Sequence, residues 1–183
     1  VQEGCNQFCT YCIVPYARGP VRSRLPESAY QEACRLVEEG YKEIVLAGIH
    51  LGSYGQDLEG DTNLNTLLKK LIEVPGLSRL RISSLDPHEF SLDILDTIKN
   101  STVICPHFHI SLQSGDNWIL KRMGRHYSTE DFLHLTDKLR SLIPDVAITT
   151  DVIVGFPGET EERYKNTKEL IEKVQFTDLH VFK

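Results

Sequence analysis

The stretch VAITTDVIV at Val146–Val154 has the composition of a buried β-strand, because it is mostly apolar and rich in β-branched residues. A loop containing Gly and Pro follows it, then a charged helical pattern over Thr160–Val174 and a second apolar strand over Asp178–Phe182. A strand, a helix and a strand in this order form one βαβ unit, whose two strands run parallel.

The same alternation continues towards the start of the chain. Further strands are expected at Glu43–Ile49, Leu80–Leu85, Phe108–Gln113 and, as a short piece, Val1–Gly4; helices are expected at Pro26–Glu39, Leu64–Glu73, Ser91–Lys99 and Thr129–Leu142. Successive strands are about 30 to 40 residues apart, the size of a βα unit. We therefore predict an α/β fold, a partial (β/α)6 TIM-type barrel with parallel strands, formed by one domain over residues 1–183. A doubly wound open sheet is the alternative, since periodicity cannot separate the two.

The charge balance limits the possible partners. The chain has 26 acidic and 20 basic residues and a net charge of -6, which argues against a general nucleic-acid coat but leaves room for a local basic patch. No apolar run approaches the length of a membrane span, and no signal peptide is visible. We expect a cytoplasmic protein with no membrane partner. The chain starts at Val1 rather than Met, just before a candidate cluster motif, which suggests that an upstream part was removed.

Three of the five cysteines, Cys5, Cys9 and Cys12, lie within eight residues with the spacing C-x3-C-x2-C. Such a triplet indicates a metal or cluster in a reducing compartment rather than a disulfide scaffold. Three thiolates can hold three irons of a 4Fe–4S cluster and leave the fourth iron open to a small molecule. The remaining two, Cys34 and Cys105, are interpreted as packing residues. The alternative is a zinc-stabilised, non-catalytic binding module whose fourth ligand comes from Cys105, His107 or His109.

The cysteine loop, with Tyr11 before its last cysteine and a short strand before its first, resembles the radical-SAM superfamily. A closer resemblance, to the methylthiotransferase family, covers nearly the whole chain and is carried by Gln2–Cys5, Ile13–Gly19, Val21–Arg24, Gly48–Gly55, Arg81–Leu85, Ser111–Gly115, Met123–Ser128 and Thr150–Thr160. Within that family, Pro15–Gly19 and Gly48–Gly55 look most like the branch that modifies threonylcarbamoyladenosine in tRNA.

The resemblance implies a 4Fe–4S cluster bound by the three cysteines and S-adenosylmethionine (SAM) bound at the open iron. One electron, from a donor such as flavodoxin or ferredoxin, would cleave SAM to a 5′-deoxyadenosyl radical. The implied substrate is the anticodon loop of tRNA, where a methylthio group is added at position 2 of the modified adenine. The alternatives within the family are isopentenyladenosine tRNA and a ribosomal protein. No residue stands out as a general base, so no catalytic side chain is predicted.

The family also has an amino-terminal domain with a second 4Fe–4S cluster and a small carboxy-terminal RNA-binding domain. Neither domain is recognisable in this sequence. We therefore expect residues 1–183 to be the core domain alone, inactive by itself in the full reaction.

The remaining site predictions combine position in the fold with what the resemblance implies. In a parallel barrel the chemistry lies at the carboxyl ends of the strands. The candidates for SAM binding are Tyr11, Gly48, Ser84, Gln113, Ser114, Arg125 and Asp151. Structural explanations remain open, among them a tight turn at Gly48 and a salt bridge from Asp151 to Arg125 or Arg81.

Arginines directly after the cysteine loop form the densest basic group near it. Arginine suits phosphate, carboxylate and base stacking. The candidates for contact with the substrate are Arg18, Arg22, Arg24 and, after the second main strand, His50.

Overall fold

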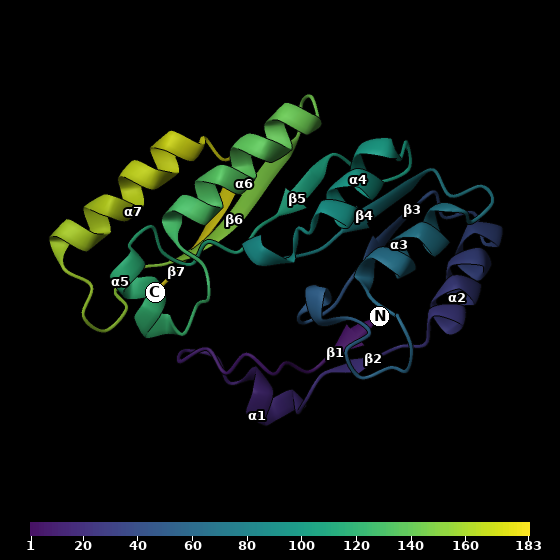
Figure 1. Ribbon diagram of the computed structural model, residues 1–183, viewed down its shortest axis with the longest axis horizontal. Coiled ribbons are helices and arrows are strands. Elements are labelled where there is room, and N and C mark those ends of the chain that lie inside the picture. Colours follow the sequence, from purple (N-terminus) through teal and green to yellow (C-terminus); the bar gives the residue numbers. More distant parts are fainter. The chain divides into compact units, whose positions relative to one another are not determined.

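The computed structural model describes residues 1–183 and divides into two compact units. The first unit comprises Val1–Asn6, Ile13–Ser84 and Ser91–Pro106, and the second comprises Gln7–Cys12, Leu85–Phe90 and His107–Lys183. The α-helices and strands of both are labelled in Figure 1.

The first unit carries the first half of the strand and helix alternation. Its elements are β1 (Gln2–Glu3), α1 (Val14–Arg18), β2 (Arg22–Ser23), α2 (Pro26–Glu38), β3 (Glu43–Leu46), the 3-10 helix η1 (Leu51–Ser53), α3 (Leu64–Ile72), β4 (Arg79–Ile82) and α4 (Leu92–Asn100). Strands β3 and β4 are parallel, with Glu43 opposite Arg79. A parallel bridge joins Leu80 to Ile104, and another joins Gln2 to Gly48.

Helix α3 shows why these residues form their elements. Asn63 accepts a hydrogen bond from the N–H of Thr66, whose hydroxyl accepts one from the N–H of Asn63, so a capping box starts the helix. Leucines at helical spacing then form one buried face: Leu64, Leu67, Leu68 and Leu71.

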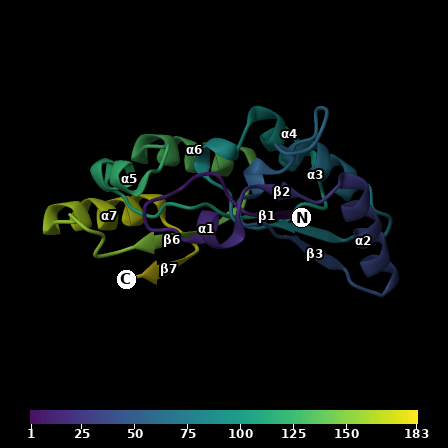
Figure 2. The same ribbon diagram turned by 90° about the horizontal axis from the view of Figure 1, so that it is seen from below.

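The second unit contains a three-stranded parallel sheet in the order β5-β6-β7. Its elements are the 3-10 helix η2 (Pro87–Glu89), β5 (His107–His109), α5 (Asn117–Met123), α6 (Thr129–Leu142), β6 (Ala147–Ile153), α7 (Glu161–Val174) and β7 (Asp178–Phe182). Figure 2 shows α6 and α7 on the same side of this sheet. Burial alternates along β6, where Ile148, Thr150 and Val152 are buried while Asp151 and Ile153 are half-buried. The half-buried face of β6 is therefore available for polar chemistry.

The predicted alternation is confirmed, with α6 and β7 at the predicted bounds and the other strands shorter than expected. Neither parallel sheet closes on itself. The elements that were not predicted are α1, α5, β2 and the two 3-10 helices η1 and η2. The expected strand at Val1–Gly4 exists as β1, but it pairs antiparallel with β2. No helix is both long and apolar enough to cross a membrane.

Candidate cofactor site

The three clustered cysteines divide between the two units in chain order. Cys5 is half-buried in the first unit, where its N–H donates to the carbonyl of Gly19 over 3.1 Å. Cys9 is buried and Cys12 half-buried in the second unit, and the N–H of Cys12 donates to the carbonyl of Cys9 over 2.9 Å. No cysteine of the chain forms a disulfide. Each of the three is therefore a thiol rather than half of a disulfide.

The segment after Cys9 is attached to the carboxyl end of helix α5. Thr10 donates its N–H to the carbonyl of Met123 over 3.0 Å and its hydroxyl to the carbonyl of Arg122 over 2.9 Å. Carbonyls at a helix end have no partner within the helix, so these bonds satisfy them. Gly124 ends α5 with a φ of 76°, and a Cβ placed on it would lie 3.7 Å from the Cα of Cys9. Helix α5, which was not predicted, thus holds the segment Gln7–Cys12, called the cysteine segment below.

Arg125 follows this helix end and is fixed by three partners. Its guanidinium donates to Cys9 Sγ over 3.5 Å and to the Tyr127 hydroxyl over 3.0 Å, and it forms an ion pair with Asp86. Burial raises the pKa of Tyr127 well above its ordinary value, so the phenol stays protonated and donates to the carbonyl of Ser111 over 2.7 Å. Arg125 was predicted to bind SAM; in the structure its side chain already contacts the sulfur of Cys9.

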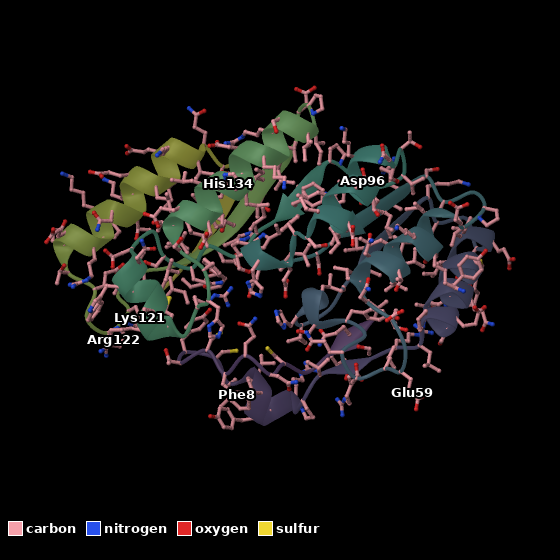
Figure 3. All side chains as sticks on the ribbon, viewed as in Figure 1. Phe8, Glu59, Asp96, Lys121, Arg122 and His134 are labelled. Carbon is pink, nitrogen blue, oxygen red and sulfur yellow. The ribbon has the colours of Figure 1, made fainter.

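A pocket of about 510 Å³ opens beside the cysteine segment within the second unit. It is lined by Thr10, Tyr11, Arg122, Ile153, Val154, Gly155, Phe156, Pro157 and Lys183. Ligand pockets commonly measure about 300–1,000 Å³ and combine an apolar lining with a few polar groups. Of the predicted residues, Tyr11 lies in this pocket. Arg122, at the end of α5 (Figure 3), and Lys183 were not predicted.

The loop after β6 is shaped by its own carboxylate. Glu159 accepts a hydrogen bond from the N–H of Gly155 over 2.6 Å, and its own N–H donates to the carbonyl of Phe156 over 2.8 Å. Gly155 has a φ of 75°, which favours glycine. These bonds hold the rim of the pocket in one conformation.

Gln113 and Ser114, at the end of the predicted strand Phe108–Gln113, differ in their surroundings. Gln113 has a φ of 63°, and its backbone bonds to Asp151 and Ile153 over 2.8 Å each. A non-glycine residue held in this region stores strain, which is commonest at functional sites. Ser114 is fully buried, and its hydroxyl contacts the Thr167 hydroxyl at 3.4 Å. This contact with α7 accounts for Ser114 structurally.

Asp151 is paired with two histidines. Its carboxylate lies 3.1 Å from His109 Nε2 on β5 and 3.2 Å from His180 Nδ1 on β7. The suggested partners, Arg125 and Arg81, are bound elsewhere, to Asp86 and Glu43. Asp151 lies opposite His180 in the strand register, which sequence spacing cannot reveal. Asp151 and the two histidines form a polar group on the sheet. Asp151 lies two positions before Ile153 on β6, and Ile153 lines the pocket.

In the first unit, Gly48 is explained by close packing. A Cβ there would lie 2.9 Å from Leu51 Cδ2 and 3.1 Å from Gln2 Cβ. His50 donates its N–H to Gln2 Oε1 over 2.7 Å, and its ring contacts Ser53 Oγ.

Ser84, after β4, is exposed, whereas its neighbour Ser83 has a buried hydroxyl oxygen with no hydrogen-bond partner.

The three arginines after the cysteine segment lie on α1, on β2 and just after β2, and all are exposed to solvent. Arg22 pairs with Glu3 over 3.0 Å, with both side chains 62 % exposed. Arg24 donates to Ser28 Oγ over 2.9 Å. Exposed pairs of this type are worth little, so these side chains can exchange their partners for a phosphate.

Comparison with known proteins agrees with this geometry. Residues 1–171 match the family model described as the Radical SAM superfamily. The fold resembles that of coproporphyrinogen III oxidase from Escherichia coli, a radical-SAM enzyme, with a TM-score of 0.64 and 18 % identity over 98 % of this chain and 42 % of that chain. It also resembles the cobalamin-dependent SAM radical enzyme OxsB, with a TM-score of 0.68 and 14 % identity over 93 % of this chain and 25 % of that chain.

Together with the family match over residues 1–171, this parallel α/β arrangement defines the class, a domain of the kind that binds SAM and a 4Fe–4S cluster. The chain belongs to the Radical SAM superfamily. These fold neighbours confirm the predicted α/β fold class.

Closer relatives are longer proteins. The chain is 49 % identical, over its whole length, to threonylcarbamoyladenosine tRNA methylthiotransferase MtaB of Bacillus subtilis, of which it covers 40 %. It is 44 % identical to tRNA-2-methylthio-N(6)-dimethylallyladenosine synthase of Pelotomaculum thermopropionicum, covering all of this chain and 41 % of that protein. The chain therefore spans about two fifths of the length of these relatives.

Proposed function

We propose that this chain is the SAM-cleaving core of a tRNA methylthiotransferase that acts on N6-threonylcarbamoyladenosine beside the anticodon. The observation that carries the proposal is the 49 % identity to a protein of that name over the whole chain. The loop motifs at Pro15–Gly19 and Gly48–Gly55, which resemble the same branch, support it.

In this proposal Cys5, Cys9 and Cys12 hold a 4Fe–4S cluster. The donor set fits, because thiolates are the ligands such clusters use and three of them leave one iron open. Cys9 suits the task further, since its sulfur accepts an N–H from Arg125. Metal-bound sulfur is commonly tuned by such neighbours. When bound, the cluster and SAM supply the reductive cleavage of SAM, with the electron coming from a donor such as flavodoxin or ferredoxin.

The pocket beside the cysteine segment is assigned to the adenine of SAM. Ile153, Val154 and Phe156 give it apolar walls that fit a flat aromatic ring. The loop held by Glu159 contributes backbone groups at its rim. Gln113 and Asp151 continue the polar face of the same unit towards the ribose and the substrate.

The exposed arginines Arg18, Arg22 and Arg24 are assigned to the tRNA. A net charge of -6 leaves the chain without a general attraction to RNA, so a local group has to supply the phosphate contacts. The relatives extend beyond the part that this chain matches. We assign the second 4Fe–4S cluster and further RNA contacts, which the family resemblance implies, to such additional chain. We place the whole reaction in the cytoplasm.

The second candidate substrate is tRNA that carries dimethylallyladenosine, which is the isopentenyladenosine named above. The reason is that a tRNA-2-methylthio-N(6)-dimethylallyladenosine synthase from Thermoanaerobacter pseudethanolicus is 48 % identical over 98 % of this chain. Membership of the Radical SAM superfamily favours an enzyme acting on either tRNA over the alternative of a zinc-stabilised, non-catalytic module.

The test uses the full-length protein, reductant, SAM and two tRNA preparations, one threonylcarbamoylated and one isopentenylated. Mass spectrometry of the digested RNA should detect the methylthio group on threonylcarbamoyladenosine. Product on the isopentenylated tRNA alone would assign the other branch. No methylthio product on either tRNA would reject the proposed function.

A further inference from the structure

The guanidinium of Arg125 has almost no contact with solvent. Its side chain is 7 % exposed, and so is that of its ion-pair partner Asp86. One nitrogen, Nη1, donates to Cys9 Sγ over 3.5 Å, Nε donates to the Tyr127 hydroxyl over 3.0 Å, and Nη2 binds Asp86. A single side chain therefore joins a cysteine sulfur to a buried carboxylate.

The surroundings hold this side chain in place. The Tyr127 ring lies 4.9 Å from the centre of the guanidinium, and the Tyr127 hydroxyl is tied to the carbonyl of Ser111 over 2.7 Å. The N–H of Arg125 donates to the carbonyl of Leu120 over 2.9 Å, which fixes its backbone at the end of α5. A side chain with three hydrogen-bonding partners and no solvent-exposed alternative keeps its geometry when a neighbouring charge changes.

The position of the guanidinium N–H at Nη1 determines how it changes the reduction potential of a cluster bound at Cys9. Reduction adds one negative charge to the cluster, part of which resides on the cysteine sulfurs. A donor aimed at such a sulfur stabilises the reduced form more than the oxidised form and so raises the reduction potential. The carboxylate of Asp86 offsets much of the distant field of the guanidinium, but it binds Nη2, whereas Nη1 points to the sulfur. The effect of Arg125 on the cluster therefore comes mainly from the short-range N–H···S hydrogen bond to Cys9.

We propose that Arg125 is a positioning residue for the cluster, whose N–H···S hydrogen bond to Cys9 raises the reduction potential of the 4Fe–4S cluster and so eases its one-electron reduction. This inference rests on the proposed function, because it requires Cys9 to be a cluster ligand.

The experiment is an anaerobic redox titration of the cluster-loaded chain, followed by electron paramagnetic resonance without SAM. The main variant is the double change Asp86→Asn with Arg125→Gln, which removes both charges and leaves no buried carboxylate without a partner. Arg125→Lys keeps the charge but loses the planar fork. Lys121→Gln is the matched control, because it removes a positive charge from the exposed side of the same helix.

The expected result is equal iron loading with a roughly tenfold weaker reduction equilibrium in the double variant, a midpoint lower by about 59 mV for one electron. Arg125→Lys should shift the midpoint in the same direction by less, and Lys121→Gln should leave it unchanged. An unchanged midpoint in a fully loaded double variant would overturn the inference while leaving the proposed function intact. Folded Arg125 variants that bind no iron would overturn it too, because the residue would then build the site rather than tune it. A wild-type chain that holds no cluster would reject the proposed function itself.

Discussion

Asn166 on α7 donates a hydrogen bond to the carboxylate of Asp116 over 2.8 Å. The other oxygen of the same carboxylate caps α5 by accepting the N–H groups of Trp118 and Ile119 over 3.0 Å each. Because the far end of α5 holds the segment after Cys9, this one buried carboxylate supports the cysteine segment through the helix.

Asp116→Ala should therefore lower the free energy of unfolding by about 2–3 kcal/mol, since it removes a cap and leaves Asn166 without its acceptor. Asp116→Asn, which can still cap the helix, should lose less. Urea unfolding followed by circular dichroism measures both. Asp93→Ala, at an exposed position in the first turn of α4, is the control and should change stability by about 0.5 kcal/mol or less. Equal losses for Asp116→Ala and Asp93→Ala would show that the cap does not matter.

The cysteines should divide into two groups on anaerobic reconstitution. Alanine at Cys5, Cys9 or Cys12 should each remove most of the bound iron, because three thiolates are the minimum that the proposed cluster uses. Alanine at Cys34 or Cys105 should leave the iron content unchanged. Burial raises the pKa of the Cys105 thiol, which keeps it protonated and a poor ligand. Iron and sulfide analysis makes the comparison, and iron loss at Cys105 would point to a different ligand set.

Filling the pocket should weaken SAM binding. Ile153→Trp adds volume to the apolar wall and should raise the dissociation constant for SAM on the cluster-loaded chain at least tenfold, about 1.4 kcal/mol. Val181→Trp, a similar enlargement at a position on β7 that is 57 % exposed and outside the pocket, is the matched control. Equilibrium dialysis with labelled SAM measures both. Unchanged affinity in Ile153→Trp would remove SAM from this pocket.

The arginine group should separate RNA binding from SAM cleavage. In the full-length protein, alanine at Arg18, Arg22 and Arg24 should weaken tRNA binding and reduce the salt slope of log K by about 2–3, while SAM cleavage without tRNA persists. Arg35→Ala, an exposed arginine of α2 already bound to Glu32, should change neither. If the triple variant loses both activities together, the arginines support the fold or the cluster instead.

Tyr54 gives a test at high pH. Its hydroxyl donates to the carbonyl of Arg24 over 2.6 Å, and burial raises its pKa to about 12, above the ordinary value of 10.0. A folded-state pKa above the unfolded one contributes stability that is complete below pH 10 and lost as the pH rises through 12. Tyr54→Phe should be less stable at pH 8, yet its stability should fall less steeply between pH 10 and 12. Parallel stability curves for the two proteins in thermal unfolding would contradict this.

The sequence predicts the elements that have strong periodicity or clear ends. Helix α6 has a capping box from Ser128 and Asp131 and a regular apolar face, so its bounds follow directly. Helix α5 was missed because seven residues are too few to show a period. The five-residue α1, with Pro15 inside it, escaped for the same reason.

The candidate site was predictable where chemistry is local in sequence, as in the cysteine triplet. The contacts of Asp151 with His109 and His180 depend on strand register, and those of Arg125 with Cys9 and Asp86 join segments far apart in the chain. No spacing rule predicts such pairs. Arg122 and Lys183 entered the pocket lining because of where α5 and β7 end.

The most direct test of the central claim is the amount of 5′-deoxyadenosine that the cluster-loaded chain releases from SAM under strong anaerobic reduction. We expect slow but sustained release that depends on Cys5, Cys9 and Cys12. We expect no methylthiolated nucleoside when threonylcarbamoylated tRNA is added to this chain alone. A chain with about four irons and four sulfides that releases no 5′-deoxyadenosine would contradict the assignment of these residues to SAM cleavage.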